Sequence, residues 1–236
     1  MSITPEHHHR NISGGSERAA VFGVSDGLVS NAALILGVAG ANPSSSVVRL
    51  AGLAGLIAGA CSMAVGEYLS VSAQVELAER ELRLERHEIV NNAGKETAEL
   101  VELYESRGAR SEVAEEMAHS VMADTDQALE VHAREELGVD PANLGSPIKA
   151  AVASFVSFID GAFVPMLTWL FGGEGTNNKV VVSMVLAAVA AVAVGWVLAM
   201  LSGQSRVRTA ARQLLLAAVS AGISFAVGSI VGVSTS

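Results

Sequence analysis

The 236-residue chain is poor in the residue types on which ordinary soluble domains depend. Only 17 % of its residues are charged and 4 % are aromatic, whereas soluble domains carry about 25 % charged residues. A single cysteine, Cys61, excludes a disulfide framework and a paired-cysteine metal site. The formal net charge of −9 argues against nucleic-acid binding, because phosphates would repel so acidic a chain. The polar, histidine-rich start also lacks the pattern of a cleavable signal peptide.

Catalytic motifs are missing as well. All six histidines lie within residues 1–18 or 72–147, and there is no G-x-S-x-G nucleophile motif. A ferritin-like di-iron centre needs two Glu-x-x-His pairs, and the segment 72–147 holds one, Glu116 with His119. Three further histidines, His7 to His9, are an ordinary surface feature of a polar arm. We therefore expect no enzyme, no catalytic residue and no prosthetic group.

What the chain does contain is apolar sequence interrupted by one acidic segment. Residues 72–147 hold 18 of the 24 acidic and 7 of the 15 basic residues, and the mean hydropathy of the whole chain is +0.43. We divide the chain into a polar arm at 1–18, apolar segments at 19–71, an acidic insert at 72–147 and apolar segments at 148–236.

Five apolar stretches are long enough to cross a bilayer, which takes about 20 helical residues. They lie at 19–41, 48–71, 148–171, 180–202 and 212–233. The sequence thus predicts an all-α integral membrane protein with five transmembrane helices and a helical insert between the second and the third.

The lysines and arginines of the connecting segments predict the orientation. They gather in the arm, in the insert and in the loop after the fourth stretch, where Arg206, Arg208 and Arg212 follow one another. Only Arg49 and Lys179 lie near helix ends on the opposite side. We expect the arm, the insert and the 203–211 loop in the cytoplasm and the C-terminus outside.

Small residues recur at helical spacing in three of the stretches. The pairs are Gly23 with Gly27, Gly55 with Gly59 and Gly228 with Gly232. Such pairs let helices approach closely in a membrane, so they predict tight helix association, including a homo-oligomer.

Polar side chains inside the apolar stretches are candidates for an ion pathway. Asp26 lies about two turns into the first stretch; an interhelical hydrogen bond is the alternative role. Met63 and Glu67 are one turn apart on the second, and a thioether beside a carboxylate suits a transition metal. Glu67 could instead be an interfacial residue that reaches water. Asp160 has a helix-packing role as readily as a functional one.

The insert is divided into helices by breakers at Asn91–Gly94, Gly108, Ala123–Thr125 and Gly138. On a helix at 95–106, Glu96 and Glu99 fall on or beside the apolar side, whereas Glu102 and Glu105 point away from it. The first helix should continue from the second apolar stretch to about residue 90.

Two other helices of the insert carry acids on the same pattern. On a helix at 125–137, Glu136 falls between apolar residues with His132 at the edge, and Glu85 and Glu88 flank the apolar stripe of the first helix. Carboxylates that face inward together raise one another's pKa unless a cation lies between them. They predict a multi-glutamate divalent-metal site, with a solvated acidic face as the alternative.

Several of these segments resemble one known family. The motifs DGLVSNAALILGVAGA, AGLAGLIAGACSMAVGEYLSVSAQ, ERELRLERHEI and REELGV are similar to those of the vacuolar iron transporter family of eukaryotic vacuoles and bacteria. The resemblance covers the chain from about Arg18 to the last apolar stretch. It implies a five-span homodimer in a lipid bilayer that carries Fe²⁺, and often Mn²⁺, out of the cytosol in exchange for protons.

The resemblance also assigns residues. It implies metal ligands in the insert at Glu85, Glu88, Glu96, Glu99 and Glu136, and in the membrane at Asp26 and Met63. The chain departs from the family at three of its positions. Gly55 stands where plant members have a glutamate, Glu67 stands where they have a glycine, and His132 replaces a methionine of the insert site. Because Gly55 and Glu67 are about 18 Å apart along a helix, Glu67 cannot serve the same site.

Together with these residues, the resemblance implies a dimeric, proton-coupled exporter of Fe²⁺ or Mn²⁺ in a bacterial-type inner membrane. The insert would capture the ion, Glu67 and Met63 would receive it, and Asp26 would pass it on. The competing hypothesis is a membrane-anchored metal-binding or sensing protein without transport. Asp26 separates the two, because an anchor has no need of an acid in the middle of a span.

Overall fold

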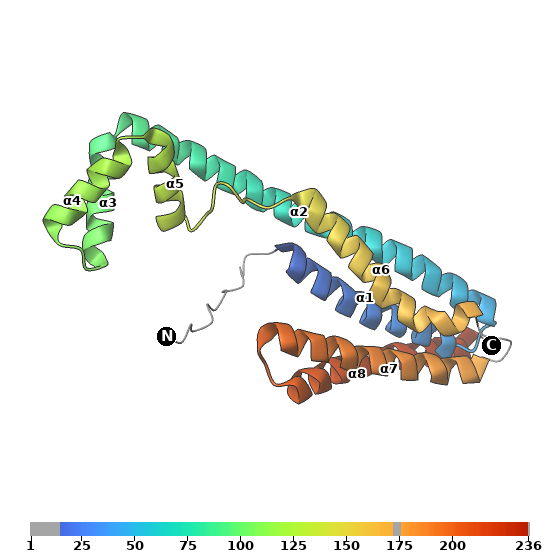
Figure 1. Ribbon diagram of the computed structural model, residues 1–236. Coiled ribbons are helices and arrows are strands. Elements are labelled where there is room, and N and C mark those ends of the chain that lie inside the picture. Colours follow the sequence, from blue (N-terminus) through green and yellow to red (C-terminus); the bar gives the residue numbers. More distant parts are fainter. Residues whose placement is uncertain (1–14, 172–175, 236) are drawn as a thin grey trace. The chain divides into compact units, whose positions relative to one another are not determined.

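The computed structural model describes residues 15–171 and 176–235, and within these ranges it contains helices and turns but no strand. Figure 1 labels the helices along the chain. They are α1 (Gly15–Gly40), α2 (Ser45–Asn91), α3 (Ala93–Ser106), α4 (Ser111–Met122), α5 (Thr125–Glu135), α6 (Pro147–Phe171), α7 (Thr176–Ser202) and α8 (Arg206–Thr235). The three histidines of the arm, His7 to His9, lie outside the described residues.

Five of the helices are long and apolar enough to cross a membrane, which confirms the predicted number. The candidate spans are Ala20–Gly40, Ser45–Asn91, Pro147–Phe171, Asn178–Ser202 and Arg206–Gly232. The second of them has 47 residues because no breaker follows the apolar stretch, as the sequence predicted. The fourth has the highest mean hydropathy, 2.6.

The chain forms two compact units. The first, the span unit, consists of residues 1–68 and 147–236; the second, the insert unit, consists of residues 69–146. Helix α2 contributes its first half to the span unit and its second half to the insert unit. We describe each unit by itself.

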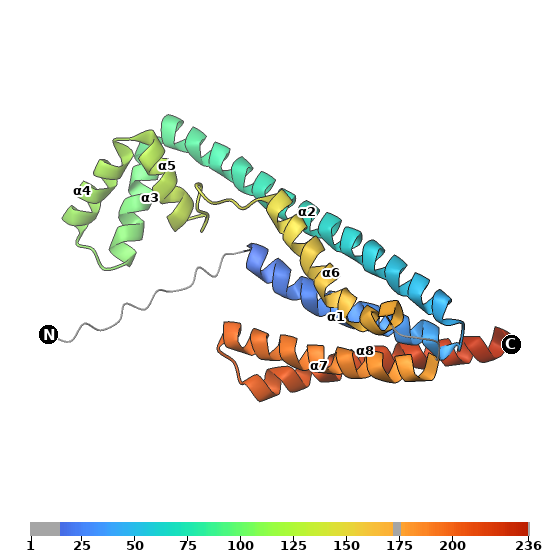
Figure 2. The ribbon, with the colours of Figure 1, turned by 45° about the vertical axis from the view of Figure 1, so that its right-hand side comes forward.

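Helix α1 is the packing centre of the span unit, in contact with α6, α7 and α8. Figure 2 shows α7 and α8 side by side, running in opposite directions. The α1–α6 interface is close because glycines meet carbonyl groups there. A Cβ on Gly27 would lie 2.1 Å from the carbonyl oxygen of Phe158, and one on Gly161 would lie 2.0 Å from that of Val24. No side chain larger than hydrogen fits at either position without moving a helix.

The small-xxx-small pairs are used for packing within the chain. Gly23 and Gly27 face α6, and Gly55 and Gly59 face side chains of α1 and α6. Gly228 faces Gly37 of α1, and Gly232 faces Ala41 in the turn after α1. The prediction of tight helix association is therefore confirmed. Its extension to a homo-oligomer loses this support, since a Cβ at each of these glycines would meet atoms of the same chain.

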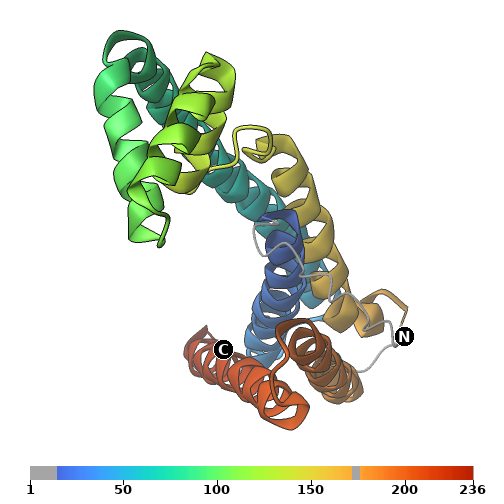
Figure 3. The same ribbon diagram turned by 60° about the vertical axis from the view of Figure 1, so that its left-hand side comes forward.

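The insert unit is built as the breakers predicted. Helix α2 ends at Asn91, α3 ends at Ser106 before Gly108, and α5 begins at Thr125. Glycines 108 and 138 have φ of +95° and +63°, a backbone conformation that glycine adopts without strain. Figure 3 shows α3 and α4 lying against each other.

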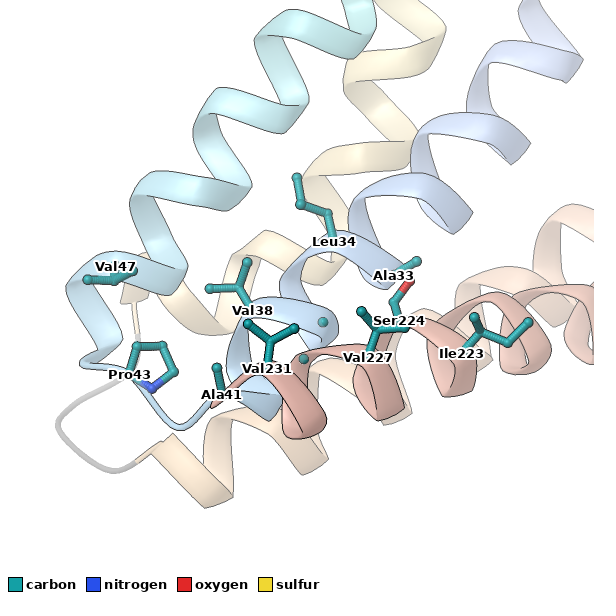
Figure 4. Close-up of a pocket in the computed structure, with 12 residues that line it drawn as sticks. Ala33, Leu34, Val38, Ala41, Pro43, Val47, Ile223, Ser224, Val227 and Val231 are labelled. Carbon is teal, nitrogen blue, oxygen red and sulfur yellow. The ribbon is translucent and has the colours of Figure 1, made fainter. Parts of the chain in front are cut away.

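An apolar recess of about 550 Å³ lies between the C-terminal half of α1, the turn that follows it, and α8. Figure 4 shows its lining side chains, which include Leu34, Val38, Ile223 and Val227, with Ser224 as a polar member. None of the predicted ligands lines it. So apolar a recess suits hydrocarbon and not an ion.

Candidate metal centre

Two short helices, α3 and α5, contribute acidic side chains and a histidine to the centre of the insert unit. On α3, Glu96 and Leu100 are buried, whereas Glu102 and Glu105 are exposed. This confirms that α3 turns Glu96 inward and the later pair outward. Glu99 is half-buried at the edge of that face.

Helix α5 supplies the histidine and the last glutamate. Its N-terminus is capped by Asp124, whose carboxylate accepts hydrogen bonds from the amides of Asp126 and Gln127. Its C-terminus closes where the amide of Val139 donates to the carbonyl of Ala133 at 2.9 Å. Glu136 therefore stands at the end of the helix, one turn after His132.

His132 lies at the centre of the acids and has no exposed surface. Its Nδ1 is 2.9 Å from Glu136 Oε1, 3.2 Å from Glu85 Oε1 and 3.8 Å from Glu96 Oε2. Three helices thus bring ligand atoms to one imidazole nitrogen. The prediction that His132 lies at the edge is wrong: the imidazole is in the middle, and Glu136 is the exposed member. We call Glu85, Glu88, Glu96, Glu99, His132 and Glu136 the insert cluster.

The cluster contains polar atoms that the protein alone does not satisfy. With Nδ1 protonated, His132 can donate one proton, and Glu136 accepts at hydrogen-bond distance. Glu85 Oε1 and His132 Nε2 are buried and make no hydrogen bond. A buried polar atom without a partner costs about 1–3 kcal/mol, so this arrangement favours a further ligand.

The pKa values of two of the carboxylates also favour a bound cation. Burial is the main cause that raises the pKa of Glu85; His132 lowers this pKa, and the negative charges of Glu136, Glu96 and Glu99 raise it. Burial also raises the pKa of Glu96, and Glu99 adds to it. Both groups therefore disfavour the ionised form unless a cation arrives.

We call Glu85, Glu96, His132 and Glu136 the inner set. The other predicted ligands of the insert, Glu88 and Glu99, lie outside it. Glu88 accepts a hydrogen bond from the amide of Asn92, with 2.5 Å between Nδ2 and Oε2. Glu99 is 2.9 Å from the ammonium of Lys95, which also lies 3.7 Å from Glu96 Oε1. The sequence reasoning missed Lys95, although its i, i+4 spacing to Glu99 was a readable signal.

The chemistry of the inner set suits a divalent transition metal. Glu85, His132 and Glu136 each offer one ligand atom, and these atoms lie within 4.8 Å of one another. Oxygen ligands with one imidazole nitrogen fit Mn²⁺ or Fe²⁺ better than Mg²⁺, which prefers oxygen and water. An ion bound at Nδ1 would take the place of its proton and contact the oxygens that the proton cannot reach.

The predicted membrane ligands lie in the span unit. Met63 packs against the apolar cluster of Leu56, Ala60, Phe158 and Ala162, and Glu67 is half-buried one turn later. Asp26 is half-buried on α1, and within the described ranges its carboxylate makes no hydrogen bond to another helix. The alternative role of Asp26, an interhelical hydrogen bond, is thus not seen in the part of the chain that the structure describes.

Asn31, also on α1, does make an interhelical hydrogen bond. It is buried, and its Nδ2 donates to the carbonyl oxygen of Ala162 on α6 at 2.7 Å. Asp160, by contrast, is exposed on α6. Its helix-packing role therefore finds no support within the span unit.

Comparison with known proteins finds similarity over most of the chain. The sequence profile of the VIT family matches residues 17–229. The chain is 40 % identical over 167 residues to a vacuolar iron transporter of Acanthamoeba castellanii, covering 70 % of this chain and 60 % of that protein. It is 31 % identical over 228 residues to vacuolar iron transporter 1 of Oryza sativa subsp. japonica, covering 94 % and 90 %. Identity to vacuolar iron transporter 1 of Arabidopsis thaliana is 28 % over 239 residues, covering 98 % and 95 %.

Proposed function

The chain belongs to the VIT family, and on that premise we propose that it is a membrane transporter that moves Fe²⁺ or Mn²⁺ out of the cytosol in exchange for protons. The names of its relatives support iron as a cargo. The metal is substrate here, and the protein works without a prosthetic group.

The observation that carries the proposal is the inner set of the insert cluster. Glu85, His132 and Glu136 each offer a ligand atom within 4.8 Å of the other two, and Glu96 faces the imidazole nitrogen of His132. The unsatisfied atoms of Glu85 and His132 and the raised pKa values of Glu85 and Glu96 indicate a place that lacks positive charge. In the proposed mechanism this set captures the ion from the cytosol, with Glu88 and Glu99 assisting at its rim.

The proposed path then leads through the membrane. Glu67 and Met63 receive the ion, and Asp26 passes it on. Among the described residues the Asp26 carboxylate makes no hydrogen bond to another helix, so a second copy across a dimer axis would let two Asp26 carboxylates share the ion. Protonation of these carboxylates from the far side would release it, which couples transport to the proton gradient.

The proposed orientation follows from the arginines. Arg206, Arg208 and Arg212 are exposed at the start of α8, where a cytoplasmic loop carries positive charge by the usual rule. The insert then lies in the cytosol and the C-terminus on the opposite side. This direction, away from the cytosol, is the same for a bacterial inner membrane and for a vacuole.

The alternative is a membrane-anchored protein that binds or senses metal without moving it. The insert cluster alone fits both functions, because capture and sensing need the same ligands. A carboxylate in the middle of α1, without a hydrogen bond to another helix within the described ranges, favours transport.

The test is transport by purified protein in proteoliposomes, read by a metal-sensitive dye inside the vesicles. We expect uptake of Fe²⁺ or Mn²⁺ that rises when the vesicle interior is acidic and collapses when a protonophore removes the pH gradient. Metal binding without any uptake, with or without the gradient, would establish the anchored binding protein instead.

A further inference from the structure

A basic side chain stands at the rim of the insert cluster, where the acids alone would repel one another. The ammonium of Lys95 lies 2.9 Å from Glu99 Oε1 and 3.7 Å from Glu96 Oε1. Glu96 is only 2 % exposed and uses its two oxygens differently. Oε2 faces His132 inside the unit at 3.8 Å, and Oε1 faces Lys95 at the surface.

No other lysine or arginine with an ion pair in the described part of the insert is paired with a carboxylate of the cluster. Their partners are Glu79 for Arg83, Asp126 for Arg86, Glu135 for Arg107, and Glu130 and Asp140 for Arg134. The position of Lys95 is therefore particular to the cluster and not a consequence of an insert rich in both charges.

We propose that Lys95 is a tethered counter-cation of the insert cluster, which neutralises Glu96 and Glu99 when no metal is bound and which an incoming divalent ion displaces. This role rests on the proposed function, because it presumes that the cluster captures metal. It makes Lys95 a residue that sets the affinity of the site without being a ligand.

The physical basis is competition between two cations for the same oxygens. The side chain of Lys95 is 66 % exposed, so its ammonium can swing into water at small cost. A divalent ion has twice the charge and binds several carboxylates at once, whereas a monovalent ion has no such advantage over the tethered ammonium. Lys95 thus lowers the affinity for every cation and discriminates against monovalent ones.

The experiment measures Mn²⁺ binding to the full-length protein in detergent, by the loss of the free-ion electron paramagnetic resonance signal. The variant is Lys95→Gln, and Lys95→Arg keeps the charge. The matched control is Arg83→Gln, because Arg83 also forms an i, i+4 pair and is 69 % exposed, but its partner Glu79 is outside the cluster.

We expect the dissociation constant for Mn²⁺ to fall by about three- to tenfold in Lys95→Gln, as the loss of one nearby positive charge predicts. Arg83→Gln and Lys95→Arg should stay within about twofold of the wild type, and added salt should narrow the gap. A dissociation constant in Lys95→Gln that is unchanged, or higher than in the wild type, overturns the role of Lys95.

A second measurement tests the counter-charge without metal, and the Mn²⁺-binding data keep the two proposals apart. In metal-free protein, Lys95→Gln should lower the melting temperature of the insert more than Arg83→Gln does, since Glu96 and Glu99 then lose their counter-charge. If wild-type protein binds no Mn²⁺, the proposed capture of metal fails and this role fails with it. If wild type and Lys95→Gln bind equally well, only the role of Lys95 fails.

Discussion

At the scale of single residues, the chemistry of the insert depends on the imidazole of His132. Its Nδ1 faces Glu85, Glu96 and Glu136, so all three acids approach the same nitrogen, and only Glu136 lies at hydrogen-bond geometry. Glu136 also stands at the C-terminal end of α5, where the helix dipole disfavours a negative charge and favours a cation. A metal ion bound at this nitrogen would relieve both the mutual repulsion and the dipole.

The first prediction concerns the inward and outward acids of α3. Glu96→Gln should weaken Mn²⁺ binding by about tenfold or more, because it removes a buried carboxylate that faces His132. Glu102→Gln should change it by less than about twofold, because Glu102 is exposed. Calorimetry of both variants in the full chain decides the matter, and equal losses would mean that the inward orientation has no bearing on binding.

The second prediction concerns pH. Glu85 and Glu96 have pKa values raised above the ordinary 4.5, so the folded insert binds protons more tightly than the unfolded chain does. Their protonated forms stabilise the metal-free fold at acidic pH, and this stabilisation is lost as the pH rises through the raised pKa values. Affinity for Mn²⁺ should change in the opposite direction, because protons compete with the metal.

The measurement is the melting temperature of the metal-free protein between about pH 4 and pH 8, for the wild type and for Glu85→Gln/Glu96→Gln. The wild type should lose stability relative to the variant as the pH rises. Comparison with the variant removes the pH dependence that other groups cause, such as Glu135, whose pKa the Arg107 guanidinium lowers. A constant difference across this range would contradict the assignment.

At the scale of helices, the span unit is held by contacts between backbones. Glycines on α1 and α6 face carbonyl groups of the other helix, and Asn31 adds a hydrogen bond from its amide. Lipid offers no hydrophobic drive for helix association, so close packing and such hydrogen bonds take its place. This accounts for the many small residues on α1 and α6.

The third prediction tests that interface. Gly161→Ala should destabilise the span unit by about 1–3 kcal/mol, since its new methyl group would meet the Val24 carbonyl oxygen. The control is Gly222→Ala on α8, where a Cβ meets no atom within 4 Å and stability should not fall. Melting in detergent, followed by circular dichroism, measures both. Equal melting temperatures would show that α1 and α6 can separate without loss.

The helices themselves follow from local signals. The breakers at Asn91–Gly94 and Gly108 give α3 its ends, and the apolar stretches give the five long helices their positions. The burial of His132 did not follow, because Leu129 and Ala133 suggested an apolar side centred elsewhere. Which side of α5 is buried depends on where α2 and α3 lie. The local sequence of α5 does not predict the positions of those helices.

At the scale of the molecule, one helix is shared by two units with different tasks. Helix α2 contributes Met63 and Glu67 to the span unit and Glu85 to the insert unit. The proposed function needs both, because the insert cluster can hold an ion but has no route across a membrane. A substitution at Asp26 distinguishes transport from metal binding alone, because only transport needs this carboxylate.

The fourth prediction is therefore made for Asp26→Asn in the full chain. The asparagine keeps the size of the side chain but removes its charge and its proton site, so transport driven by a pH gradient should fall to background. Mn²⁺ binding by the insert cluster should be unchanged. Proteoliposome uptake and calorimetry measure the two, with Asp160→Asn as a control for loss of a carboxylate from another span. Transport at wild-type rate by Asp26→Asn would make Asp26 structural.

The sequence by itself determined the helical class, the five apolar helices, the ends of the insert helices and the inward position of Glu96. These depend on hydropathy, breakers and helical periodicity, all of which act over a few residues of one chain. Only the tertiary structure decided that His132 is central, that Lys95 pairs with Glu96 and Glu99, and that the glycine pairs are covered within the chain. Each of these depends on which helices meet and at what distance, because charge and packing act between side chains far apart in sequence.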